Sequence, residues 1–326
     1  MYHLEDLIAK IRHQLKTIRR VLIVSHLRPD GDAIGSLLGI GLALQEAGKE
    51  VQMVLSDGVP ENFQHLVGSE QVKNCAEGEF DYIIVVDSSE VERTDTALAG
   101  YPIPDLNIDH HKTNTNFGKI NLVESGAVAT AEILARYLPN FGLTLTQAVA
   151  NALLTGILTD TIGFRTANVN SSVLRLAADL MDFGGNIADI YYPALVEHSL
   201  AAARYWGAGL SKIQYENGLV WTTLTLEDRD VAGYPDGDDA DLVNVLSAIK
   251  GADIAIILVE QSSGYVKISW RLCGRSSSDL DVSEIAQKYG GGGHKAAAGA
   301  EVLGKLDEIL SKVIDDTRVL INHVNI

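Results

Sequence analysis

Acidic and histidine side chains follow four separate apolar segments of the chain, in SHLRPDGDAIGS, VVDSS, NIDHH and GILTDT. In chain order they are His26, Asp30 and Asp32, then Asp87, then Asp109, His110 and His111, and finally Asp160. Oxygen and imidazole donors without thiolate suit Mn²⁺, and Mg²⁺, Co²⁺ or Zn²⁺ could replace it. Because carboxylates brought together repel one another unless cations neutralise them, the pattern predicts a site for two divalent metal ions.

Such a pair of ions has a characteristic chemistry. Two divalent ions held roughly 3.5 to 4 Å apart activate a water molecule and stabilise both the attacking and the leaving oxygen of a displacement at phosphorus. We therefore expect a hydrolase that acts on phosphoester bonds.

Each segment taken alone also has a simpler interpretation. Asp30 and Asp32 could belong to a turn and a helix N-cap, because aspartate is favoured at both places. Asp87 could cap a helix, and Asp160 could form a turn with its own backbone. Four such coincidences at the ends of apolar runs are hard to explain in this way, so the metal-site hypothesis is preferred.

The elements that would position these residues alternate between strands and helices. Short, β-branched runs typical of buried parallel strands lie at 21–25, 51–55, 82–87 and 105–109. Helical patterns cover 4–18, 33–47, 127–138, 145–158 and 172–183. This alternation predicts an α/β fold with a doubly wound, mostly parallel sheet, in which ligands bind at the carboxyl ends of the strands.

The length of 326 residues favours two domains. We expect a catalytic metal-binding domain at 1–190, a linker helix at 191–212 and a smaller α/β domain at 213–326. The last of these contains the strand-like runs LVWTTLTL, IAIILVE and YVKISWRL and a helical pattern at 240–249.

The four acidic and histidine segments resemble, in order and spacing, the motifs of the DHH phosphoesterase family. The resemblance implies one metal ion held by His26, Asp30 and Asp87, and a second held by Asp32, Asp87, His110 and Asp160. Asp87 would bridge the two ions and be essential for catalysis. His111 would face the substrate and help to protonate or orient the leaving group, and Asp109 would orient the neighbouring histidines.

A glycine-rich segment, GGGGHKAAAGA at 290–300, is the second strong signal. Consecutive glycines let backbone N–H groups approach a phosphate closely, although a hairpin or a helix-entry loop would also explain the run. The segment resembles the GGGGH signature of the DHH-associated domain, which implies that Gly291, Gly292, Gly293 and His294 bind substrate. Arg271 matches the family's phosphate-binding arginine, and Arg275 is the alternative because the register is ambiguous.

The surroundings of this segment reverse the charge of the whole chain. Between 267 and 295 there are five basic residues against three acids, namely Lys267, Arg271, Arg275, Lys288 and Lys295. Trp206, Trp221 and Trp270 could stack on bases, although tryptophan more often lies in a core or an interface. Of the three, Trp270 is the strongest candidate because it adjoins Arg271.

Composition excludes several classes of protein. The formal charge of −17 disfavours a surface that grips long duplexes. No signal peptide or membrane span is evident, and the two distant cysteines, Cys75 and Cys273, predict no disulfide framework. A cytoplasmic location is therefore expected. The first strand is followed by GDAIGS and not by GxGxxG, which disfavours a nicotinamide enzyme.

The two regions together resemble bacterial oligoribonucleases of the nano-RNase type, many of which also remove the 3′-phosphate from 3′-phosphoadenosine 5′-phosphate. The resemblance implies a two-metal, Mn²⁺-dependent phosphodiesterase or phosphatase. Its substrates would be bisphosphorylated nucleotides or single-stranded RNA or DNA oligonucleotides of two to about five residues, and the enzyme could be a homodimer. The alternatives are hydrolysis of linear or cyclic dinucleotides, and a non-catalytic nucleotide sensor. A pyrophosphatase would share the metal motifs but not the GGGGH segment.

Overall fold

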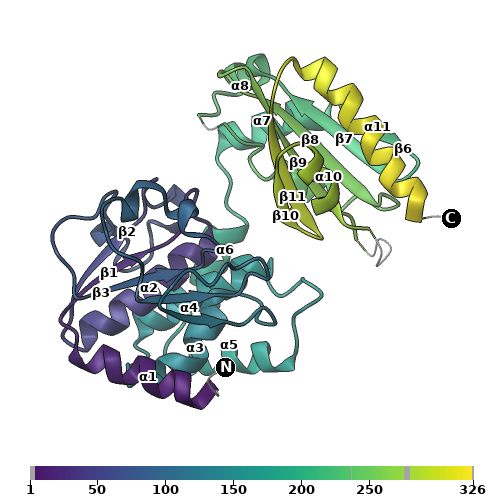
Figure 1. Ribbon diagram of the computed structural model, residues 1–326. Helices are drawn as coiled ribbons and strands as arrows, with labels where there is room; N and C mark the ends of the chain where they lie inside the picture. The colour runs from purple at the N-terminus through teal and green to yellow at the C-terminus, as the bar shows by residue number, and fades with distance from the viewer. Residues whose placement is uncertain (1–3, 236, 275–279, 325–326) are drawn as a thin grey trace. The chain divides into compact units, whose positions relative to one another are not determined.

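The chain folds into two compact units, Met1–Glu197 and His198–Ile326 (Figure 1). The computed structural model describes residues 4–235, 237–274 and 280–324. The boundary between the units falls inside the stretch 191–212, where two helices, α6 (Ile187–Leu195) and α7 (Leu200–Leu210), take the place of a single linker helix. The second helix begins where the side chain of Ser199 accepts a hydrogen bond from the N–H of Ala202.

A parallel sheet of five strands organises the described part of the first unit, in the order β2-β1-β3-β4-β5. The strands are β1 (Arg20–Val24), β2 (Glu50–Val54), β3 (Tyr82–Val86), β4 (Leu106–Asp109) and β5 (Ile120–Val123). The chain leaves the central pair β1 and β3 in opposite directions, which makes the gap beyond their carboxyl ends the expected ligand site of this topology. Strand β5 was not expected from the sequence.

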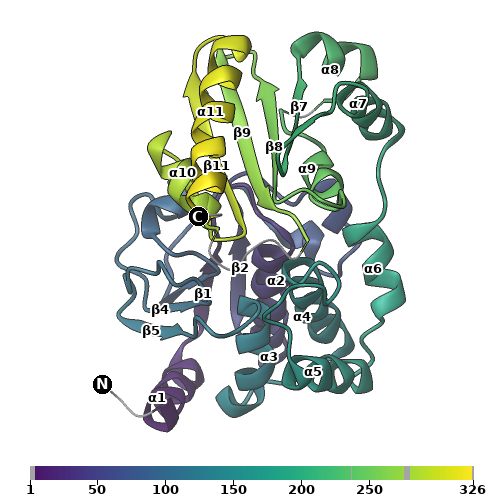
Figure 2. The same cartoon turned by 90° about the vertical axis from the view of Figure 1, so that its right-hand side faces the viewer.

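The two faces of this sheet are covered differently. One face packs against α1 (Leu4–Thr17), α2 (Gly31–Glu46), α3 (Thr130–Phe141) and α4 (Gln147–Asp160), with α5 (Ser171–Asp182) alongside α3 and α4. The other face packs against the 3₁₀ segment η3 (Val91–Leu98) and loops. Figure 2 shows α2, α3 and α4 gathered on one side of the unit. Short 3₁₀ turns, η1 (Glu61–Phe63) and η2 (Ser69–Gln71), separate β2 from β3.

Helices α2 and α4 approach each other so closely that only glycine fits at their contact. A Cβ atom on Gly35 would lie 2.4 Å from the carbonyl oxygen of Ala152. A Cβ atom on Gly156 would lie 2.6 Å from Oδ1 of Asp32 and 2.5 Å from Cβ of Ala131. The same contact therefore fixes the distance between the helices and the position of the Asp32 carboxylate.

Replacing Gly156 with alanine is expected to reduce both stability and activity. The added methyl group has to displace the Asp32 carboxylate or helix α3, and overpacking of this kind costs about 1 to 3 kcal/mol. Chemical denaturation and initial rates on the same samples measure the two effects. Gly207→Ala is the matched control, because a Cβ atom there meets nothing within 4 Å. Equal stability and equal activity of Gly156→Ala and Gly207→Ala would contradict the tight contact between α2 and α4.

The second unit contains a mixed sheet in the order β10-β11-β9-β8-β7-β6, in which only β7 and β8 pair in parallel among the described residues. Its strands are β6 (Gln214–Glu216), β7 (Leu219–Leu224), β8 (Ile254–Glu260), β9 (Tyr265–Leu272), β10 (Gly292–His294) and β11 (Ala297–Leu303). Its helices, besides α7, are α8 (Leu226–Ala232), α9 (Leu242–Leu246), α10 (Val282–Lys288) and α11 (Leu306–Val324). One face packs against α10 and α11, and the other against α7 and α9. Over the described residues of both units, no helix combines the length and the apolar character needed to cross a bilayer.

Candidate active site

The acidic and histidine residues singled out in the first unit converge in one place. They form three groups within which potential ligand atoms lie within 4.8 Å of one another: Asp87 with His110 and His111, His26 with Asp30 and Asp87, and Asp32 with His110 and Asp160. Because Asp87 and His110 each belong to two groups, the three groups make one continuous site. Their residues come from the carboxyl ends of β1, β3 and β4, from the start of α2 and from the end of α4.

Asp87 lies at the centre of the site. Its Oδ2 atom is 3.4 Å from Nε2 of His26, and its Oδ1 atom is 3.8 Å from Nε2 of His110 and 3.7 Å from Nδ1 of His111. Burial alone would raise the pKa of this carboxyl, but the three histidines outweigh it and hold the pKa well below its usual range. The backbone of Asp87 is left-handed, with φ 55°, a costly conformation of the kind found at functional sites.

Asp32 is buried and held by three donors. Its carboxylate accepts hydrogen bonds from the backbone N–H groups of Thr130 (2.6 Å) and Ala131 (2.9 Å) at the start of α3, and from the hydroxyl of Ser36 (3.2 Å). Burial and the nearby carboxylates of Asp87 and Asp160 nevertheless raise its pKa well above the ordinary value. A side chain fixed in place yet short of positive charge is what a divalent cation would complete.

Asp160 closes the site from the end of α4. Its Oδ2 atom lies 3.2 Å from Nε2 of His110. Burial, together with the charges of Asp30 and Asp87, raises the pKa of this carboxyl well above the ordinary value. A buried and a half-buried aspartate with raised pKa values, beside the Asp87 carboxyl with a lowered pKa, indicate a deficit of positive charge in the protein alone.

Asp30 has the structural role that the simpler interpretation gave it. Its Oδ1 atom accepts hydrogen bonds from the N–H groups of Asp32 (3.1 Å) and Ala33 (3.0 Å) and so caps α2. The same atom lies 3.8 Å from Nε2 of His26. The cap therefore also brings a carboxylate to the cluster of potential metal ligands, and the two interpretations are compatible.

Asp109 connects the two histidines of the DHH triplet. Its Oδ1 atom accepts hydrogen bonds from Nδ1 of His111 (2.7 Å) and from the backbone N–H of His110 (2.9 Å). Its Oδ2 atom accepts from Nδ2 of Asn114 at 2.6 Å. Burial would lower the pKa of His111, but the bond to Asp109 and the charge of Asp87 outweigh it and raise the pKa. The position of Asp109 suits a residue that orients its neighbours.

Several residues around this site were missed in the sequence. The hydroxyl of Thr130 donates to Oδ1 of Asp87 at 3.0 Å, and the carbonyl of Arg93 accepts from the N–H of Leu27, next to His26, at 2.7 Å. The charge of Arg93 also acts on His26 and His111. A lone arginine after acidic residues in SSEVERTD was the available signal for Arg93, whereas nothing local marks Thr130.

In the second unit, Arg271 and His294 lie on the same face of the sheet. Both are opposite Ala297 in the pairing of β9 with β11 and of β10 with β11. Residues directly opposite one another in antiparallel strands project to the same side. Arg275, the alternative phosphate-binding residue, lies outside the described residues.

The glycine-rich segment forms a hairpin, and packing explains part of it. A Cβ atom on Gly291 would lie 2.1 Å from the carbonyl oxygen of Gly299, and one on Gly293, at φ 145°, would lie 2.5 Å from that of Ala297. A Cβ atom on Gly292 would meet nothing within 4 Å. Of the three glycines expected to bind substrate, Gly292 is therefore the one that packing does not require.

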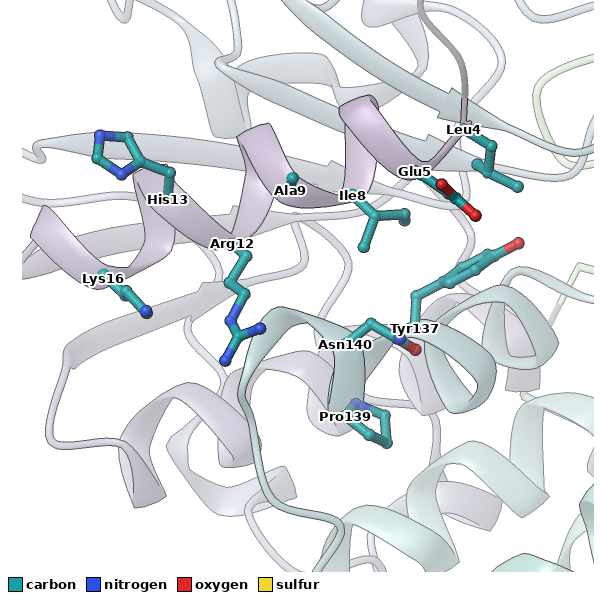
Figure 3. A pocket seen from close by; sticks show the side chains of 10 residues that line it. All are labelled: Leu4, Glu5, Ile8, Ala9, Arg12, His13, Lys16, Tyr137, Pro139 and Asn140. Atoms are coloured by element: carbon teal, nitrogen blue, oxygen red, sulfur yellow. The ribbon is translucent and has the colours of Figure 1, made fainter.

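A separate hollow of about 580 Å³ lies between α1 and α3 (Figure 3). Its described lining combines apolar residues such as Ile8 and Pro139 with the basic side chains of Arg12 and Lys16. The lining includes none of the acidic and histidine residues that converge beyond the strands. The catalytic interpretation therefore belongs to the donor site and not to this hollow.

Known proteins with related sequences point to the same chemistry. Residues 20–157 match the DHH family, N-terminal domain, and residues 230–318 match the DHHA1 domain. A Thermus thermophilus protein named bifunctional oligoribonuclease and PAP phosphatase NrnA is 34% identical over 91% of this chain and 89% of its own length. A Bacillus subtilis protein of the same name is 26% identical over 89% and 92%. The crystal structure of an exopolyphosphatase-related protein from Bacteroides fragilis superposes with a TM-score of 0.87, at 25% identity and 97% coverage of both chains.

Proposed function

The chain belongs to the DHH family and hydrolyses phosphoester bonds, and on this premise we propose that it acts on very short oligonucleotides and on 3′-phosphoadenosine 5′-phosphate. The observation that carries the chemistry is the convergence of seven donor residues, spread from position 26 to position 160, on one site. The substrate class is supported by the names and the near full-length coverage of the relatives from Thermus thermophilus and Bacillus subtilis.

The donor set fits two divalent ions. His26, Asp30 and Asp87 would hold one ion, and Asp32, Asp87, His110 and Asp160 the other. The raised pKa values of Asp32 and Asp160 support this assignment, because cations would relieve the repulsion that raises them. We assign Mn²⁺ as the metal, since the donors are oxygen and imidazole without thiolate.

Different residues of the chain would have separate roles around these ions in catalysis and in substrate binding. When bound, the ions supply an activated water molecule and positive charge for the transition state. His111 would help to protonate or orient the leaving group, since the hydrogen bond to Asp109 and the charge of Asp87 raise the pKa of its ring and so favour the protonated form. Asp109 would hold that ring in position through its 2.7 Å hydrogen bond. Arg271 and Gly291 to Gly293 would bind substrate phosphate, with Arg275 as the alternative arginine, and His294 would contact the terminal phosphate or a base.

A panel of substrates with Mn²⁺ tests the proposed function. It compares a 5′-labelled dinucleotide, a five-residue RNA, a long single strand, 3′-phosphoadenosine 5′-phosphate and pyrophosphate. We expect turnover of the dinucleotide, the five-residue RNA and the bisphosphorylated nucleotide to exceed that of the long strand and of pyrophosphate. Preferential cleavage of pyrophosphate would reject the substrate class.

Adding linear and cyclic dinucleotides to the same panel, and measuring nucleotide binding, tests the two alternative functions. Linear and cyclic dinucleotides as the preferred substrates would narrow the function to a dinucleotide phosphodiesterase. Tight binding of nucleotides without turnover of any compound would favour a non-catalytic sensor. We place the activity in the cytoplasm, in keeping with free cysteines at Cys75 and Cys273.

A further inference from the structure

An aromatic pair, His198 and Trp206, lies at the surface of the second unit. The ring centroids are 4.4 Å apart with an interplanar angle of 58°. His198 is exposed, whereas Trp206 is half-buried and packs against the core beneath α7 and α9. The indole N–H of Trp206 donates to the carbonyl of Ala240 at 2.7 Å, which fixes the ring that supports His198. The pair therefore offers an exposed imidazole on a rigid base.

The backbone that holds this pair is strained. Ala240 and Asp241 are both left-handed, with φ values of 50° and 63°, although neither is glycine. The N–H of Ala240 donates to Oδ1 of Asp238 at 2.9 Å, and the N–H of Val243 donates to Oδ2 of Asp239 at 2.9 Å. These bonds keep the turn in a conformation that is costly for residues with a side chain, and such turns occur preferentially at ligand sites.

The same turn places the aromatic pair in a region that contains both basic and acidic side chains. On β9, Val266, Ile268 and Trp270 face the core formed with α10 and α11, so the alternate residues Lys267, Ser269 and Arg271 project to the opposite face, where α7 and α9 pack. The charges of His198, Arg271 and Lys267 all act on Asp241. Asp239 and Asp241 both act on Arg271, so His198 and the arginine proposed to bind phosphate share their surroundings with these two carboxylates of the turn.

The other two tryptophans do not have this position. Trp270, the strongest candidate in the sequence, is fully buried and donates from Nε1 to the hydroxyl of Thr317 at 3.2 Å. Trp221 is half-buried and packs against the core formed with α10 and α11. Trp270 is therefore a core residue, in agreement with the interpretation of the tryptophans as core or interface residues.

We propose that His198, supported by Trp206, stacks on the nucleobase of the nucleotide whose phosphate Arg271 binds. The inference deepens the proposed function and rests on it. Base stacking on aromatic side chains tolerates any base, because every base has a π face. A single stacking platform beside a single guanidinium suits a substrate of one or two nucleotides, since it offers one place for a base and one for a phosphate.

The test compares ligands with and without a base. Binding of AMP and of ribose 5-phosphate, in the presence of Mn²⁺, is measured by calorimetry on the full chain. The variants are His198→Ala, His198→Phe and Trp206→Leu, with Trp221→Leu as the matched control. KM and kcat for 3′-phosphoadenosine 5′-phosphate are measured on the same samples.

We expect His198→Ala to weaken AMP binding by about 5- to 150-fold, the range that loss of one stacked base gives. His198→Phe should keep AMP binding, binding of ribose 5-phosphate should not change, and the loss should appear in KM more than in kcat. Equal binding of AMP by His198→Ala and the unaltered chain, or an equal loss for both ligands, overturns the inference. Failure of the unaltered chain to hydrolyse any member of the substrate panel would instead overturn the proposed function.

Discussion

Replacing Asp87 with asparagine should lower kcat on the order of a thousandfold or more while the chain stays folded. Asp87 lies within 3.4 to 3.8 Å of three histidines, and its carboxylate is the one that the proposed assignment shares between both ions. One substitution would therefore weaken two metal sites. Steady-state kinetics and metal binding by calorimetry, each with Mn²⁺, measure the effect.

Asparagine is a cleaner replacement than alanine at this position. Asparagine tolerates the left-handed φ of 55°, whereas alanine adds a conformational cost of about 1 to 2 kcal/mol. Asp87→Ala should also be inactive, but part of its effect would come from the backbone. Asp179→Asn, on an exposed face of α5, is the matched control and should retain full activity. Normal metal binding and turnover by Asp87→Asn would exclude the central role of this residue.

Removing divalent ions with a chelator should abolish turnover and make the stability of the protein fall as pH rises. The folded protein raises the pKa of Asp32 and of Asp160, so it binds more protons than the unfolded chain above the ordinary aspartate value of 3.8. Stability therefore decreases as pH rises from that value through the raised pKa values. The raised pKa values of His26 and His111 act in the same direction above 6.5.

The lowered pKa of Asp87 makes stability rise with pH, which is the opposite direction, but it does so at lower pH. Its contribution is complete above the ordinary aspartate value, so it is constant across the range of interest. Adding Mn²⁺ at about 100 times its dissociation constant should restore about 2.7 kcal/mol per ion and flatten the pH dependence. Thermal unfolding between about pH 5 and pH 8, with chelator or with Mn²⁺, measures both effects.

One variant separates the contribution of the raised aspartate pKa values to this pH dependence from the contributions of other groups. Asp160→Asn removes one of the two carboxyl groups whose pKa is raised well above the ordinary value. As pH rises, the metal-free variant should therefore lose less stability than the unaltered metal-free protein. Stability of the metal-free protein that increases with pH in that range would contradict the predicted electrostatics of the site.

The sequence singled out the acidic and histidine residues that converge in the first unit because their signal is local. His26, Asp87 and His110 each follow an apolar run that forms a strand, and parallel strands bring their carboxyl ends to one edge. Asp109, which orients the two histidines, shares this signal, but Thr130 does not. Thr130 contacts Asp32 and Asp87, which lie 98 and 43 positions away, so only the packing of α3 on α2 brings them together.

The elements that were missed or misjudged carry weak or ambiguous patterns. Strand β5 has four residues with alternating burial at the edge of the sheet, and a run that short resembles a loop. The four glycines gave no strand signal, yet β10 pairs with β11 because glycine allows close approach of the backbones. Trp270 adjoins Arg271 in the sequence but does not share its surroundings, because alternation along β9 sends adjacent side chains to opposite faces.

In the parallel sheet of the first unit, the carboxyl ends and the amino ends of the strands have different roles. The proposed metal donors that follow strands lie beyond the carboxyl ends of those strands, whereas the turns at 47–49, 78–81 and 99–105 precede strands at their amino ends. Gly100, in the last of these turns, meets nothing within 4 Å of an added Cβ atom. The amino edge is thus the side on which such enzymes can diversify, by lengthened turns or grafted peptides, without disturbing the reaction carried out at the other end of the strands.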